Sequence, residues 1–95
     1  MTDYELVVAI SPEVTDDNLH TVVEKVSRFI TERGGEVKEV QQWGRRRMAY
    51  TVKHFREANY VLTRLQLDPK AAKDVEASLS ISEEVLRHLL VKRER

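Results

Sequence analysis

The 95-residue sequence predicts an α+β domain whose elements follow the order β-α-β-β-α-β. Three patterns support this prediction: two segments place apolar side chains at helical spacing, four segments alternate as strands do, and the prolines and glycines fall where an element should start or stop. About 39 residues, or 41%, are apolar, which is enough for one modest core. We therefore expect a single domain over residues 1–95.

The first strand and the first helix have the clearest patterns. Tyr4–Ile10 alternates, and both of its faces are largely apolar, which is typical of a central strand. A helix is expected over Thr15–Arg33, because Thr15 or Asp16 can cap its start and Gly34-Gly35 can provide a left-handed stop. Its apolar stripe consists of Leu19, Val22, Val23, Val26, Phe29 and Ile30.

The middle of the sequence predicts two further strands. Glu36–Lys53 alternates with an irregularity, so we expect a β-bulge near Gly44. A loop is expected over Lys53–Asn59, followed by a strand over Tyr60–Leu67. One face of that strand should carry Val61, Thr63, Leu65 and Leu67.

The last third of the sequence predicts a helix and a final strand. Asp68-Pro69 is a helix start with an N-cap and a first-turn proline, and Ala72, Val75 and Leu79 mark the buried side. Val85–Val91 reads as the last strand, followed by a charged tail over Lys92–Arg95. The complete order is the split βαβ, or ferredoxin-like, arrangement: a four-stranded antiparallel sheet with two helices on one face. The other face should stay open unless a partner covers it.

Composition excludes several classes of protein. Sixteen basic and sixteen acidic residues give a net charge of zero, so any attraction to nucleic acid must be local. The absence of cysteine excludes disulfides, iron–sulfur clusters and thiol chemistry. The longest apolar run, Leu6–Ile10, is far shorter than the ~20 residues of a membrane helix, and no signal peptide is evident. We expect a soluble intracellular protein.

No motif for catalysis or cofactor binding is present. The three histidines, His20, His54 and His88, lack metal-ligand spacing, and Gly34-Gly35 ends a helix rather than opening a phosphate loop. Acylphosphatase shares this topology but binds phosphate through an arginine after its first strand, whereas Ser11–Thr15 contains none. We therefore expect no enzymatic activity, no metal and no cofactor.

Charge is unevenly distributed along the chain. From Trp43 to Arg56 there is no acidic residue, and aromatic residues are interleaved with five cations. These candidate nucleic-acid contacts are Arg45, Arg46, Arg47, Lys53 and Arg56. Arginine binds phosphates and stacks on bases, and aromatic rings stack on unpaired bases. The alternative is a solvated loop with ordinary aromatic anchors.

Strand alternation constrains how the arginines can act. Arg45 and Arg47 should lie on one side of the strand and Arg46 on the other, unless Gly44 introduces a bulge. Arg46 could then face a protein partner or solvent. The acidic residues collect elsewhere, and those before the last strand, Glu83 and Glu84, are interpreted as solvated turn residues.

These segments resemble the bacterial ribosomal protein S-six (S6) family over essentially the whole chain. The similarity is most specific at Trp43–Tyr50, and Gly34–Val37, Tyr60–Leu62 and Val85–Arg87 also fit. Met48 replaces a usual leucine and Thr51 a common proline, and the sequence stops at Arg95 where several relatives extend.

The resemblance implies a non-enzymatic structural constituent of the small ribosomal subunit. In that family the protein binds small-subunit rRNA as a heterodimer with ribosomal protein S-eighteen (S18), and a basic partner would explain how a protein of zero net charge binds RNA. The alternative function is a ferredoxin-like ligand-binding or regulatory module that dimerises through its sheet. The acid-free stretch and the lack of a glycine-rich loop after the first strand favour the ribosomal interpretation.

Overall fold

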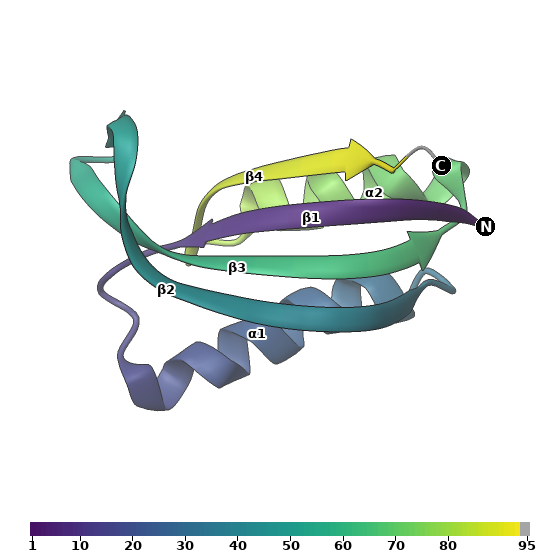
Figure 1. Cartoon of the computed structure of the whole chain (residues 1–95), viewed down its shortest axis with the longest axis horizontal. Coiled ribbons are helices and arrows are strands. Elements are labelled where there is room, and N and C mark those ends of the chain that lie inside the picture. Colours follow the sequence, from purple (N-terminus) through teal and green to yellow (C-terminus); the bar gives the residue numbers. More distant parts are fainter. Residues whose placement is uncertain (94–95) are drawn as a thin grey trace.

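Four strands and two helices follow each other in the predicted order, which confirms the ferredoxin-like α+β fold. A computed structural model describes residues 1–93. The strands form one antiparallel sheet in the order β2-β3-β1-β4, and both helices pack against the same face of it (Figure 1). The elements are β1 Thr2–Ile10, α1 Asp16–Thr31, β2 Glu36–Val52, β3 Phe55–Leu67, α2 Pro69–Ile81 and β4 Val85–Lys92.

The first helix buries its predicted stripe. Val22, Val26 and Ile30 are buried, and the other three residues of the stripe pack partly buried around them. Thr15 occupies the N-cap position but its side chain makes no capping hydrogen bond. The predicted glycine stop is confirmed as a Schellman motif: the Gly34 N–H donates to the Thr31 carbonyl and the Gly35 N–H to the Ile30 carbonyl.

Gly35 also lies where no side chain fits. A Cβ atom at this position would come within 2.7 Å of Ile30 Cγ2, 2.8 Å of Leu67 Cδ1 and 2.9 Å of the Gln66 carbonyl oxygen. The last of these is backbone, so the strand itself would have to move. Gly34 contributes differently, because its φ of +80° is a conformation that other residues adopt at a cost.

The second helix begins as predicted. The Asp68 side chain caps it by accepting a hydrogen bond from the Lys70 backbone N–H at 2.9 Å, and Pro69 is its first residue. Val75 and Leu79 are buried against the sheet. The last strand also agrees with the prediction, with one residue added at its end. The described part of the predicted tail ends at Arg93, and the rest of Lys92–Arg95 lies outside the described residues.

The predicted loop over Lys53–Asn59 is wrong. The loop is only the two residues Lys53 and His54, and β3 already begins at Phe55, which pairs with Val52. Both loop residues have positive φ, 50° and 72°, as in a type I′ hairpin turn. Such turns normally use Asn-Gly, so the sequence carried no turn signal here.

The predicted bulge at Gly44 is confirmed. The pairing of β2 with β3 shifts between Gln42 and Gly44, which leaves Trp43 as the extra residue, and Gly44 has a φ of +81°. Residues after the bulge therefore change their side of the strand relative to a regular strand. This change determines which basic side chains share a face.

Two hydrophobic clusters hold the fold together. The main one joins both helices to the sheet around residues such as Leu6, Leu65 and Leu79. A smaller cluster on the opposite sheet face contains Ala9, Met48, Ala58 and Leu86. Figure 1 shows the outer part of the β2–β3 hairpin bending away from the line of the other strands, at the end of the sheet opposite the N-terminus. The sheet face that was expected to be open is therefore partly covered near the hairpin, by side chains of the hairpin that belong to the smaller cluster.

Neither helix in residues 1–93 has the length and apolar character to cross a membrane.

Candidate nucleic-acid interface

The five predicted cations all lie in the outer part of the β2–β3 hairpin. Arg45, Arg46 and Arg47 are on β2, Lys53 is in the turn and Arg56 is near the start of β3. All five side chains are exposed. The hairpin therefore gives Lys53 and Arg56 fixed positions near the three arginines, which a loop over residues 53–59 would not do. It does not place the five cations on one face.

Arg45 is engaged within the protein. One of its terminal nitrogens donates to the Pro12 carbonyl oxygen at 3.2 Å, and its Nε lies 4.0 Å from a carboxylate oxygen of Glu57. Glu57 follows the acid-free stretch in sequence, and antiparallel pairing returns it opposite Arg47. Arg45 thus ties the hairpin to the loop after β1, and it is less available to a ligand than its neighbours.

Arg46 lies against an aromatic ring. Its guanidinium carbon is 5.6 Å from the centre of the Trp43 ring, within the range of a cation–π contact. Regular alternation would place these two residues, three positions apart, on opposite faces. The bulge at Gly44 removes that separation. The predicted irregularity therefore has a specific result, a stacked arginine on the face away from the helices.

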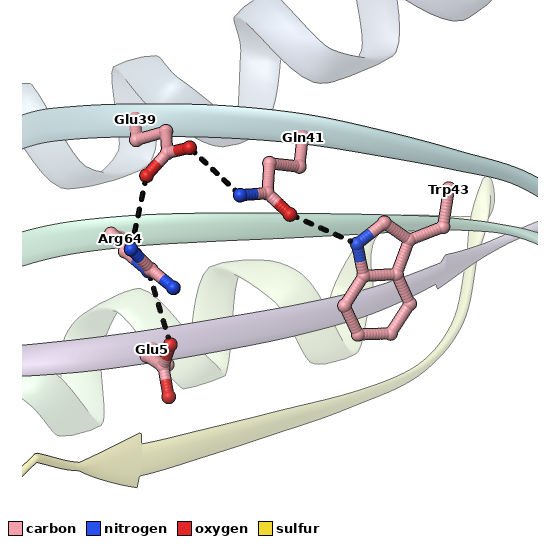
Figure 2. Close-up of polar contacts among 5 residues, drawn as sticks. All are labelled: Glu5, Glu39, Gln41, Trp43 and Arg64. Carbon is pink, nitrogen blue, oxygen red and sulfur yellow. Dashed lines mark hydrogen bonds and ion pairs between the residues drawn. The ribbon is translucent and has the colours of Figure 1, made fainter.

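The position of Trp43 is set by a chain of polar contacts across three strands (Figure 2). Its Nε1 donates to Gln41 Oε1 at 3.2 Å, and Gln41 Nε2 donates to Glu39 Oε2 at 2.7 Å. Arg64 of β3 bonds both Glu39 on β2 and Glu5 on β1, each at 3.2 Å. Sequence reasoning missed this network, because only the strand register shows that Arg64 lies between the two carboxylates.

A second cation–aromatic pair joins the hairpin to the last strand. The Arg87 guanidinium carbon on β4 is 5.2 Å from the centre of the Tyr50 ring on β2. Arg87 was not among the predicted contacts, because β2 and β4 are at opposite edges of the sheet. The bend of the hairpin brings them together, and no local sequence pattern indicates that bend.

Four cations of the hairpin form no ion pair in the part of the chain that the structure describes. Within residues 1–93, no ion pair involves Arg46, Arg47, Lys53 or Arg56. Positive charges that form no ion pair produce a local positive potential, even in a chain of zero net charge. This part of the surface is suited to binding phosphates.

Titratable groups elsewhere have structural roles. His88 Nε2 lies 3.5 Å from a Glu76 carboxylate oxygen, which joins β4 to α2. Glu84 accepts hydrogen bonds from Ser82 Oγ at 3.0 Å and Lys25 Nζ at 3.3 Å, so the interpretation of Glu84 as a merely solvated residue is wrong. Its own backbone N–H and the Ser82 hydroxyl do most to hold the pKa of Glu84 below its usual range; burial opposes them, and Lys25 lowers the pKa further. The described residues contain no cluster of His, Asp and Glu that could hold a metal ion.

Comparison with known proteins identifies the family. A sequence model of the family described as ribosomal protein S6 matches residues 3–92. The chain belongs to the ribosomal protein S6 family. It is therefore a small-subunit ribosomal protein with a structural role, and not an enzyme.

Individual relatives agree along the full length. The small ribosomal subunit protein bS6 of Moorella thermoacetica is 42% identical over 94 residues, covering 99% of this chain and 96% of the relative. That of Clostridium acetobutylicum is 35% identical over 95 residues, covering 100% of both chains. The crystal structure of 30S ribosomal protein S6 from Thermotoga maritima superposes with a TM-score of 0.90 at 28% identity, covering 97% of this chain and 87% of that one.

Proposed function

We propose that this S6 protein binds small-subunit rRNA together with S18, and that the outer part of its β2–β3 hairpin contacts the RNA. The observation that carries the proposal is the group of cations that form no ion pair within residues 1–93, Arg46, Arg47, Lys53 and Arg56, beside exposed Trp43 and Tyr50. Cations attract phosphates, and exposed rings offer faces on which unpaired bases can stack. Arg45 belongs to the same surface, but we expect it to contribute less to RNA binding because it already contacts Pro12 and Glu57.

The face of the sheet away from the helices is the surface we propose for S18. Leu89 and Val91 of β4 are about half exposed on this face. Exposed apolar side chains that lie together are typical of a protein-interaction site. Farther from the hairpin tip, the same face carries the carboxylates of Glu5 and Glu39 around the guanidinium of Arg64. A basic partner would complement this acidic excess, and it would also supply positive charge for the RNA.

We further propose that residues 1–95 act as one domain. Both helices and all four strands contribute to the main core or pack against it, which supports cooperative folding. Coincident denaturation curves from Trp43 fluorescence and from far-ultraviolet circular dichroism are expected. Separate transitions would indicate two units.

The test of the proposed function is binding to tiled fragments of small-subunit rRNA with and without S18. We expect one region to bind the S6–S18 mixture tightly and S6 alone weakly, because the partner supplies part of the charge. Sedimentation should show a one-to-one complex of the two proteins. Binding of no fragment under low-salt conditions with the complex intact would contradict an RNA-binding role.

A further inference from the structure

A shallow concavity of about 390 Å³ lies where the hairpin meets the end of α2 and the start of β4. Its wall includes Tyr50 and Lys53 from the hairpin, Ser80 from α2, and Arg87 and His88 from β4. The volume is within the range of about 300–1,000 Å³ that is usual for small-ligand sites. The concavity shares only Lys53 with the predicted contacts, so it extends beyond the surface already described.

The chemistry of the wall favours an anion. Lys53 and Arg87 are cations, and no ion pair engages either of them within residues 1–93. Among the described residues, no carboxylate lines the concavity. Its apolar lining residues, Leu79, Val85 and Leu86, are buried, so they offer little surface to an apolar ligand.

The wall also offers a surface for stacking. The Tyr50 side chain is 60% exposed, and Arg87 contacts its ring with the guanidinium carbon 5.2 Å from the ring centre. A base can stack on a free ring face or on the planar guanidinium of arginine. Because Arg87 already lies against the ring, ordering it on binding costs less entropy.

We propose that this concavity takes one unpaired nucleotide of the rRNA, with its base stacked at Tyr50 and Arg87 and a phosphate beside Lys53 and Arg87. The inference rests on the proposed function. A shallow, open site has few contacts with which to hold a free nucleotide. A nucleotide in a strand already held by the hairpin cations has a high effective concentration at the site, so weak contacts are sufficient.

The test compares variants of the S6–S18 complex for affinity to the rRNA fragment over a range of salt concentrations. Tyr50→Ala should lower the affinity at least about fivefold without changing the salt slope, because stacking on a ring releases no counterion. Arg87→Gln should lower both the affinity and the slope, the slope by about 0.7–0.9. Tyr50→Phe should bind as the wild type does, and Lys92→Gln, at the far end of β4, is the matched charge control.

Four outcomes would overturn the site. The first is unchanged affinity of Tyr50→Ala and Arg87→Gln while Arg46→Gln with Arg47→Gln binds weakly; this leaves the proposed function standing. The second is unchanged affinity of all these variants, which removes the hairpin from RNA binding altogether. The third is loss of the complex with S18 at unchanged folding stability, which would make the concavity part of the protein interface. The fourth is saturable binding of free adenosine monophosphate at micromolar concentration, which would indicate a site for a free ligand.

Discussion

On the sheet surface opposite the helices, the middle of the sheet and the hairpin region use arginine in different ways. In the middle of the sheet, Arg64 lies between Glu5 and Glu39, and its charge is neutralised within the protein (Figure 2). Toward the hairpin, Arg46 lies on the ring of Trp43 and Arg87 on the ring of Tyr50. Neither arginine forms an ion pair with a carboxylate within residues 1–93. A cation on a ring keeps its charge available, whereas a cation between carboxylates does not. The net charge of zero therefore hides a clear division of roles.

The largest expected effect comes from removing cations at the hairpin. Replacing Arg46, Arg47 and Arg56 together by Gln should reduce the salt slope of rRNA affinity of the S18 complex by about 2.1–2.7, if each contacts one phosphate. The free energy of unfolding should fall by no more than about 1 kcal/mol, because these side chains are exposed and only the cation–π contact of Arg46 with Trp43 is lost.

The matched control removes three exposed cations from the helices. Replacing Arg28, Lys70 and Lys73 by Gln changes the net charge equally, but these residues lie on the helices and not on the hairpin. The slope of this control should change far less. Equal reductions in the two triple variants would mean that net charge, rather than this surface, determines binding.

The central arginine should affect stability instead. Arg64→Gln removes two partly exposed ion pairs, which are typically worth about 0.2–1 kcal/mol each. We expect the free energy of unfolding to fall by about 1 kcal/mol, as measured by urea denaturation. Arg64→Lys should lose less of the free energy of unfolding than Arg64→Gln does. A stability equal to that of the wild type would show that the network only orients Trp43.

Lys53 and His54 in the hairpin turn should lower the stability of the fold, and we expect the Lys53 charge to be kept because it binds RNA. Lys53→Asn with His54→Gly suits the two positive φ values, so stability should rise by about 1 kcal/mol. Loss of the Lys53 charge should reduce the salt slope by about 0.7–0.9. A more stable variant with unchanged slope would remove Lys53 from the RNA surface.

The smallest effect concerns pH and lies outside both regions. The pKa of Glu84 is lowered in the folded state, so its contribution to stability is present above its unfolded pKa and is lost as the pH falls through the folded pKa. Glu84→Gln should therefore be less stable than the wild type at pH 7, with the difference shrinking toward acid pH. Denaturation midpoints at pH 7 and below pH 4 check this; a constant difference would point to packing instead of charge.

Local patterns in the sequence were sufficient for most of the fold. Apolar spacing located both helices, Asp68-Pro69 and Gly34-Gly35 marked their ends, and an interruption of alternation indicated the bulge at Gly44. The start of β3 escaped prediction, because residues 55–58 pair only with β2 and lack regular apolar alternation, while Lys53-His54 is an unusual pair for a tight turn.

The candidate surface was predictable as a group of charges but not as a geometry. The acid-free stretch identified the five cations, but only the register brings Glu57 back beside Arg45. Arg64 and Arg87 required knowledge of which strands are neighbours and of how the hairpin bends. These are long-range relations, and one sequence contains no local signal for them.

The most direct test of this division is a matched pair of single variants, Arg46→Gln and Arg64→Gln, each bound to S18 and titrated with the same rRNA fragment at several salt concentrations. Both remove one arginine charge from the same sheet face. We predict that Arg46→Gln lowers the salt slope by about 0.7–0.9 and that Arg64→Gln leaves it unchanged. Equal slopes for the two variants, or a reduction only in Arg64→Gln, would contradict the assignment of the ring-stacked arginines to RNA.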